Sequence, residues 1–173
     1  MAFEIERKFL VRGDFMKDVY ESVRILQGYL ARTGRCSVRV RLRGESGFLT
    51  IKGPTDAAGV SRFEWEKEVG AEDAVSLMAL AEPGRVEKIR HLAKNADGVH
   101  TWEIDEFLGE NQGLVMAEIE LRSADDEFDR PEWLGAEVTG DPRFYNSMLA
   151  RRPFGTWDED EKARTLAGIA DIV

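Results

Sequence analysis

The sequence predicts a β-dominated α+β protein, built on a closed eight-stranded antiparallel β-barrel with a charged interior and with helices packed outside. Short segments alternate apolar and polar residues, which is the period of a strand with two different faces. Turn-forming residues such as Gly34 and the Asn95–Gly98 run separate them, which indicates consecutive hairpins. The polar face of nearly every segment is charged. The eight segments are residues 3–12, 25–33, 36–43, 47–52, 62–69, 85–92, 100–107 and 114–122.

Helical spacing replaces the strand pattern in other parts of the chain. We expect helices at residues 14–23, 71–82 and 144–151, and a terminal helix in residues 157–173, whose acidic start suits the positive end of a helix dipole. The first two helices would cover the outside of the barrel with apolar residues. These are Phe15, Met16 and Val19 in the first helix, and Val75, Leu77, Met78 and Leu80 in the second.

The composition bounds the domain organisation and the partners. At 173 residues and 43% hydrophobic, the chain can build one core, so we expect one domain at residues 1–155 and a helical extension at residues 156–173. The net charge of −9 at pH 7 disfavours binding to nucleic acid or to an anionic membrane. The first residues lack the apolar run of a secretion signal, which favours a cytoplasmic protein. The oligomeric state stays open, with a homodimer as one alternative.

The charges on the strand faces are sorted by sign. An ordinary surface intersperses the two signs, because neighbouring like charges repel. Solvated outer faces of a β-sandwich remain the alternative explanation. If the charges instead face the inside of a barrel, they must be paired, hydrated or compensated by a ligand, since burying a single charge is costly. The acidic pairs are Glu4/Glu6, Glu64/Glu66, Glu103/Asp105 and Glu118/Glu120, and the basic sets are Arg39/Arg41/Arg43 and Lys88/Arg90.

These residue types indicate a particular chemistry. Carboxylates without neighbouring His or Cys suit hard cations such as Mg²⁺ or Mn²⁺, and such ions commonly accompany phosphates. The Arg and Lys side chains offer donors that match phosphoryl oxygens, and a metal-bound water could act as the nucleophile. No Ser–His–Asp arrangement or phosphate-binding glycine loop is apparent, and His91 and His100 are predicted to be structural.

From Glu4 to Val11 the sequence reads EIERKFLV and resembles the CYTH superfamily, the triphosphate tunnel metalloenzymes. Further segments match in family order over about residues 2–153. They include QGYL (27–30), VRVR (38–41), LTIKG (49–53), SRFEWE (61–66), VEKIR (86–90), WEID (102–105) and AEIE (117–120). The chain departs from the family at His91, where an aromatic residue is usual, and its form of the Arg-Tyr-x-Asn segment is Arg143-Phe144-Tyr145-Asn146.

The resemblance implies an eight-stranded tunnel that binds a triphosphate and a divalent metal ion, Mg²⁺ or Mn²⁺. Lys8, Glu4 and Glu6 are the implied catalytic residues, with an electrostatic role favoured for Lys8 because a lysine normally stays protonated. The implied substrate-binding residues are Lys8, Arg39, Arg41, Lys52, Lys88, Arg90 and Tyr29. The implied metal ligands are Glu4, Glu6, Glu118 and Glu120, with Glu64, Glu66, Glu103 and Asp105 as further members.

The start of the chain resembles the bacterial inorganic triphosphatases of the superfamily most. The expected reaction is therefore hydrolysis of inorganic tripolyphosphate to diphosphate and phosphate by a metal-activated water. The alternatives are a thiamine triphosphatase or nucleoside triphosphatase, an adenylate cyclase of the class IV type, and a polyphosphate-binding module without catalysis.

Overall fold

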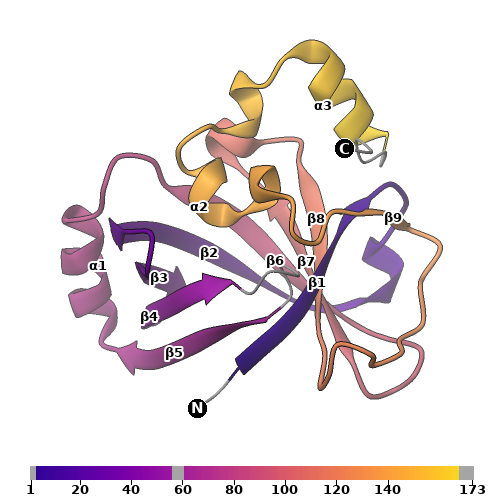
Figure 1. Ribbon diagram of the computed structural model, residues 1–173, viewed down its shortest axis with the longest axis horizontal. Coiled ribbons are helices and arrows are strands. Elements are labelled where there is room, and N and C mark those ends of the chain that lie inside the picture. Colours follow the sequence, from indigo (N-terminus) through magenta and orange to yellow (C-terminus); the bar gives the residue numbers. More distant parts are fainter. Residues whose placement is uncertain (1–2, 56–60, 168–173) are drawn as a thin grey trace.

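The computed structural model describes the backbone of residues 3–55 and 61–167, and the side chains of residues 5–54 and 62–167. Nine strands form one antiparallel sheet (Figure 1). Each of the eight predicted strand segments coincides with one of them. The strands are β1 (Phe3–Val11), β2 (Val19–Arg32), β3 (Ser37–Arg43), β4 (Ser46–Thr55), β5 (Ser61–Val69), β6 (Val86–Lys94), β7 (Thr101–Phe107), β8 (Val115–Glu120) and β9 (Leu134–Glu137).

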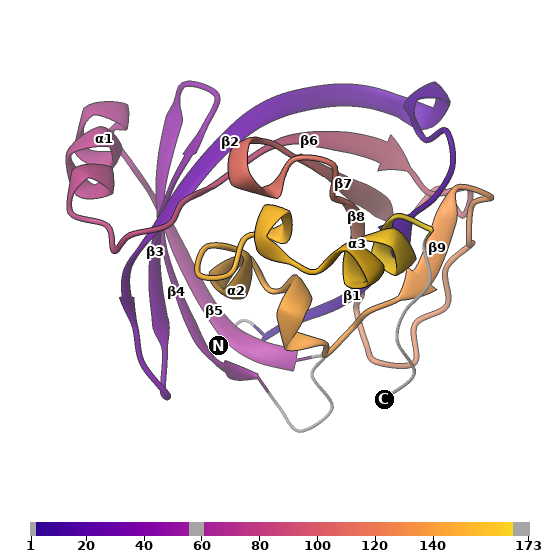
Figure 2. The same cartoon turned by 90° about the horizontal axis from the view of Figure 1, so that it is seen from above.

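The first eight strands close into a barrel. Their order around the sheet is β5-β4-β3-β2-β6-β7-β8-β1, and β1 pairs again with β5, where Glu4 lies opposite Arg62 in the register. Figure 2 shows the resulting ring of strands. The short β9 is an addition to the barrel, paired with the end of β1 from Phe9 to Val11. The predicted eight-stranded closed barrel is therefore confirmed, while β9 has no counterpart among the predicted strands.

Helix α1 (Ala71–Ala79) covers one side of the barrel, as the prediction for residues 71–82 requires. Its Ala74 and Met78 pack against Val40 on the outer faces of β2, β3 and β4. The predicted contacts of Val75 and Leu80 are wrong, because these side chains are 57% and 74% exposed. The helix has a narrower buried face than its apolar composition indicates, because only the residues along one side of a helix can contact a sheet.

The helix predicted at residues 14–23 is wrong. A single 3₁₀ turn, η1 (Met16–Asp18), is followed directly by β2, which begins at Val19. Val19 and Val23 pair with Ala93 and Arg90 of β6 in the strand register. β-branched residues favour this extended pairing over a helix. The long strand pairing thus overrides the local helical spacing.

A loop, and not a helix, covers the outer face of β1, β7 and β8. Phe9, Trp102 and Ile119 belong to an apolar cluster that Trp133 and Phe128 complete from the segment between β8 and β9. The rings of Phe9 and Trp102 meet edge to face at 5.7 Å, and those of Trp102 and Trp133 at 5.5 Å. This packing turns the charged face of the same strands inward.

The C-terminal segment seals one end of the barrel. It contains η3 (Pro142–Phe144), α2 (Asn146–Leu149), η4 (Phe154–Thr156) and α3 (Glu159–Leu166), and it lies over the ring of strands in Figure 2. Its apolar residues share a cluster with inward-facing strand residues that lie two positions from the charged ones. The cluster includes Leu10, Val86, Phe107, Met116, Phe144, Leu149, Phe154 and Trp157. The barrel interior therefore has an apolar, closed end and a charged, open part.

Two of the predicted helices fall in this segment. The prediction at residues 144–151 is confirmed only in part, because α2 has four residues and follows a 3₁₀ turn. The terminal helix is confirmed as α3, where the side chain of Asp158 accepts a hydrogen bond from the Glu161 amide at 2.8 Å; residues 168–173 lie outside the described part. The division at residue 155 stays a prediction. Among the described residues, no helix is both long and apolar enough to span a membrane.

Candidate functional site

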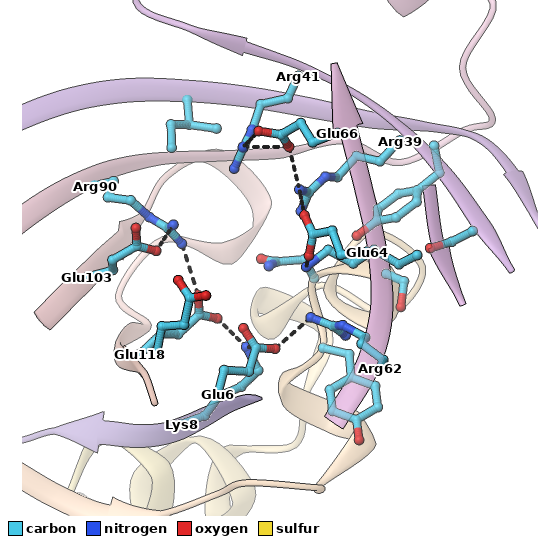
Figure 3. A pocket seen from close by; sticks show the side chains of 18 of the residues that line it. Glu6, Lys8, Arg39, Arg41, Arg62, Glu64, Glu66, Arg90, Glu103 and Glu118 are labelled. Carbon is cyan, nitrogen blue, oxygen red and sulfur yellow. Dashed lines mark hydrogen bonds and ion pairs between the residues drawn. The ribbon is translucent and has the colours of Figure 1, made fainter. Parts of the chain in front are cut away.

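The charged part of the barrel interior is a cavity of about 270 Å³ (Figure 3). Most of the predicted site residues line it. They are Glu6, Lys8, Tyr29, Arg39, Arg41, Lys52, Glu64, Glu66, Arg90, Glu103, Glu118 and Glu120. The side chain of Glu4 lies outside the described part of the structure. Lys88 and Asp105 are not in the lining, because they are buried behind it at 1% and 0% side-chain exposure.

Lys8 lies among acidic side chains. It stands opposite Glu118 in the β1–β8 register, forms an ion pair with it, and has its Nζ 3.1 Å from Glu6 Oε1. Arg62 binds the same Glu6 oxygen at 2.6 Å from the neighbouring strand. Burial by itself would lower the pKa of Lys8, but the carboxylates of Glu118 and Glu6 outweigh this effect and raise its pKa. These contacts favour the charged form of Lys8, and its role in a reaction stays a prediction.

Arg90 joins the acidic side of the cavity to the buried pair behind it. Its guanidinium donates to Asp105 through two bonds of 2.7 Å, to Glu118 at 3.0 Å, and to Glu103. Lys88 forms a further ion pair with Asp105. Burial lowers the pKa of Lys88 to about 8 against the opposing effect of Asp105. Burial would raise the pKa of Asp105, but Arg90 and Lys88 hold it below its ordinary value.

The opposite side of the cavity is basic. Arg41 Nη2 contacts both oxygens of Glu66 at 3.1 and 2.9 Å, and Thr50 donates to Glu66 at 2.6 Å. Arg39 Nη2 lies 3.3 Å from Thr50 Oγ1, and Lys52 pairs with Glu64 at 2.6 Å. Among the described residues, the Nε atoms of Arg39 and Arg41 are buried and have no hydrogen-bond partner. Burial and the nearby Arg39 lower the pKa of Arg41. This wall thus holds more cationic donors than its own carboxylates satisfy.

Each side of the cavity carries charges of both signs that pair with one another. Figure 3 shows Arg39, Arg41, Glu64 and Glu66 together on one side, and Lys8, Glu6, Arg90, Glu103 and Glu118 together on the other. Over the part of the chain with described side chains, no three Asp, Glu, His or Cys residues are grouped closely enough to hold a metal ion. The acidic side of the cavity is therefore organised around Lys8 and Arg90 in this structure.

Some lining residues are missing from the predicted site. Arg43 and Arg62 lie two positions from Arg41 and Glu64, so the strand alternation carries the signal that could have included them. The stretch from Tyr145 to Ser147 also lines the cavity. Only the tertiary folding of the C-terminal segment brings it there, and no periodicity in its sequence points to the barrel.

Tyr29 lies in the wall of the cavity, whereas the two histidines lie outside its lining. Tyr29 lies in the cavity wall with 5% exposure, and burial raises the pKa of its hydroxyl. His91 and His100 lie outside the cavity lining. His91 hydrogen-bonds Ser22 at 2.8 Å, and His100 bridges Asp97 at 2.7 Å and Asp126 at 3.2 Å. These contacts agree with structural roles for both histidines.

Comparison with protein families shows which family this barrel belongs to, because the model of the CYTH domain matches residues 2–145. The chain belongs to the CYTH domain family. This CYTH chain is 44% identical over 160 residues to an inorganic triphosphatase of Acetivibrio thermocellus. The alignment covers 92% of this chain and 100% of that relative. It is 38% identical over 150 residues to an inorganic triphosphatase of Nitrosomonas europaea. That alignment covers 85% of this chain and 96% of the relative.

A solved structure has a similar fold. The crystal structure of an inorganic triphosphatase superposes with a TM-score of 0.64 and 35% sequence identity, over 87% of this chain and 95% of that one. The similarity extends over nearly the whole of both chains. The predicted family and the tunnel fold are thereby confirmed.

Proposed function

We propose that this CYTH protein hydrolyses inorganic tripolyphosphate to diphosphate and phosphate. The observation that carries the proposal is the basic wall, where Arg39 and Arg41 line a polar cavity and their buried Nε donors have no hydrogen-bond partner among the described residues. A buried unpaired donor is costly, so such a wall is explained by an anionic ligand that completes it. The two relatives bearing the name inorganic triphosphatase support the same reaction class.

The basic wall suits a chain of phosphoryl groups. Arg39 and Arg41 lie two residues apart on β3, and Lys52 lies on the neighbouring β4. Guanidinium groups bind phosphoryl oxygens through paired N–H donors, whereas lysine acts as a point charge. We assign substrate binding to these three residues and to Arg62, whose guanidinium reaches the same cavity from β5.

The carboxylates of the wall formed by β1 and β8 fit a hard divalent cation by their donor chemistry. Glu6, Glu118 and Glu120 line the cavity and offer only oxygen ligands, as Mg²⁺ and Mn²⁺ prefer. Glu6 and Glu118 pair with Lys8 and Arg90 and, among the described residues, are not grouped as a metal site, so an ion would have to draw these carboxylates together. We assign metal binding to these three residues and to Glu4, whose place in the β1 register is two positions before Glu6. When bound, such an ion neutralises phosphate charge and lowers the pKa of a coordinated water.

Other acidic residues have contacts that favour positioning over metal binding. Glu66 accepts hydrogen bonds from Arg41 and Thr50, and Glu64 pairs with Lys52. These carboxylates set the direction of the cations that would bind phosphate. In the same way, Asp105 holds Arg90 through two hydrogen bonds, and Lys88 reaches Asp105 and not the cavity. We therefore assign Glu64, Glu66, Lys88 and Asp105 to the support of the site.

In the proposed reaction, the oxygen of water forms a bond to a terminal phosphorus and the water gives up a proton to solvent, while the bridging P–O bond breaks with its electron pair passing to diphosphate. The protein needs to supply position and charge for this step and no covalent intermediate. Lys8 stays protonated because its pKa is raised, so it stabilises negative charge on the reacting phosphoryl group. Arg90, held between Asp105 and Glu118, keeps a second positive charge beside it.

A phosphate-release panel tests the proposal. Tripolyphosphate, thiamine triphosphate, ATP and diphosphate are each supplied with Mg²⁺, with Mn²⁺ or with a chelator. We expect the highest kcat/KM with tripolyphosphate and no turnover with the chelator. Preference for thiamine triphosphate or ATP would replace the substrate, and cyclic AMP formed from ATP would indicate a cyclase. Tight binding of tripolyphosphate without turnover would indicate a module that only binds polyphosphate.

A further inference from the structure

The closed end of the cavity is built by a part of the chain that the catalytic scheme above does not use. Tyr145, Asn146 and Ser147 form this floor at the start of α2. Beneath it, the apolar cluster of Phe144, Leu149, Phe154 and Trp157 fills the end of the barrel. The floor therefore rests on a packed core.

Polar contacts also tie the floor to the barrel wall. Arg32 on β2 donates from Nη1 to the Ser147 carbonyl oxygen at 2.9 Å, and its Nε binds Glu82 at 2.7 Å. Asn111 donates to the Leu149 carbonyl oxygen at 3.4 Å and accepts from the Phe154 amide at 2.8 Å. Side chains on this floor are thus held at a defined position relative to the phosphate-binding strands, which is a requirement for a specific contact.

Asn146 has an unsatisfied amide at this position. Its Oδ1 is buried and has no hydrogen-bond partner among the described residues, and the residue lines the same cavity as Arg39 and Lys52. A buried polar group without a partner needs a physical reason. A half-turn of the carboxamide exchanges its oxygen and nitrogen, so the same side chain can present two N–H donors to an anion. With the carboxamide so turned, an N–H donor takes the position of the unpartnered oxygen, and a ligand oxygen in the cavity would accept a hydrogen bond from it.

We propose that Asn146 is a substrate-binding residue, whose carboxamide donates a hydrogen bond to the inner terminal phosphoryl group of tripolyphosphate at the closed end of the cavity. The proposal rests on the proposed function and extends it, because it assigns a neutral donor from the C-terminal segment to a site otherwise built from charged barrel strands. A neutral donor at the floor can bind the innermost phosphoryl group without adding a further positive charge to the cavity.

Two substitutions of Asn146 separate binding from a purely structural role. Asn146→Asp keeps the size of the side chain and places a negative charge beside the phosphoryl group, whereas Asn146→Ala only removes the donor. We expect Asn146→Ala to raise KM for tripolyphosphate about tenfold, as for loss of a hydrogen bond to a charged group, and Asn146→Asp to raise it further. In both variants kcat changes less than KM and the Tm stays close to that of the wild type.

Met148→Ala is the matched control, because Met148 lies on the same short helix with 36% exposure and is absent from the cavity lining. It should keep the wild-type KM. A KM within about twofold of wild type in both Asn146 variants would overturn the proposal. So would a loss that is equal in the two variants and accompanied by a lower Tm, since this pattern indicates packing.

Calorimetric measurement of tripolyphosphate binding to each variant tests the Asn146 contact separately from the proposed hydrolysis. A wild type that binds tripolyphosphate but releases no phosphate rejects the proposed hydrolysis, yet weaker binding by Asn146→Asp than by Asn146→Ala still supports the contact. Turnover by the wild type with unchanged affinity in both variants rejects the contact and keeps the hydrolysis.

Discussion

Lys8 on β1 and Glu118 on β8 lie directly opposite each other in the barrel register and form a buried ion pair inside the cavity. Each also contacts a second partner, since Lys8 reaches Glu6 and Glu118 reaches Arg90. Together with Arg90 of β6, the two strands thus contribute one continuous chain of alternating charges. This arrangement explains how a narrow cavity can hold several ionised groups, because the carboxylates of Glu6 and Glu118 are each stabilised by at least one cation.

The Lys8 pair gives a direct test of how this lysine acts. If Lys8 serves as a fixed charge, Lys8→Arg should keep a measurable fraction of activity, whereas Lys8→Met should lose about a hundredfold in kcat, as for removal of one electrostatic donor. Steady-state phosphate release from tripolyphosphate measures both. Equal and complete loss in the two variants, together with loss of the rise in activity with increasing pH, would instead indicate a general base.

Arg39 and Glu118 lie on opposite walls, so their substitution should change different kinetic properties. Arg39→Ala removes a phosphate-binding fork, so we expect a higher KM for tripolyphosphate at unchanged metal dependence. Glu118→Ala should chiefly raise the concentration of Mg²⁺ or Mn²⁺ needed for half-maximal activity. Metal titrations of both variants make the comparison. Equal losses that do not depend on metal concentration would contradict this division of roles.

Glu66 tests the assignment of a carboxylate to positioning. Glu66→Gln weakens its contacts with Arg41 and Thr50, so KM for tripolyphosphate should rise several-fold while the metal requirement stays constant. Glu68→Gln is the matched control, because Glu68 follows on the same face of β5, is exposed and is absent from the cavity lining. A changed metal requirement in Glu66→Gln alone would return Glu66 to the metal ligands.

His100 predicts a pH dependence of stability away from the cavity. The hydrogen bond to Asp97 raises the pKa of His100 above its ordinary value of 6.5 against the effect of burial, with a further contribution from Asp126. Arg122 also contacts Asp126. A raised native pKa stabilises the fold below pH 6.5, and this contribution is lost as the pH rises through the native pKa.

Urea unfolding of the wild type and His100→Asn across pH 5.5–8.5 checks this effect, over about one to two pH units on either side of the ordinary pKa. The wild type should lose free energy of unfolding as the pH rises, and the variant should show a smaller slope. Parallel curves for the two proteins would show that protonation of His100 does not stabilise the fold.

Trp157 tests whether the predicted extension belongs to the barrel core. It is 3% exposed, and its ring lies 5.5 Å from Phe144 and 5.2 Å from Phe154. Trp157→Ala should reduce the free energy of unfolding by about 3–5 kcal/mol through the lost contacts and the resulting cavity. Leu166→Ala, at a site with 55% exposure on α3, should have little effect. A stable Trp157→Ala protein would favour an independent extension from residue 156.

The positions of the strands and the faces of the barrel could be predicted from the sequence because each is a local property. The alternation of Glu6 with Ile5, or of Arg39 with Val38, records which side of a strand meets water and which meets a packed surface. Most of the charged site follows from this alternation. Local spacing misled at residues 14–23, where pairing with β6 decides between helix and strand.

Tertiary structure alone decided which of the charged residues face the cavity and which support it. Lys88 and Arg90 are equivalent in the strand pattern, yet the apolar cluster at the closed end buries Lys88 against Asp105 while Arg90 reaches the cavity. The closure of β5 on β1 and the floor at Asn146 likewise depend on contacts between distant parts of the chain. Such contacts leave no periodic signal, because their partners are fixed by packing in three dimensions and not by spacing along the strand.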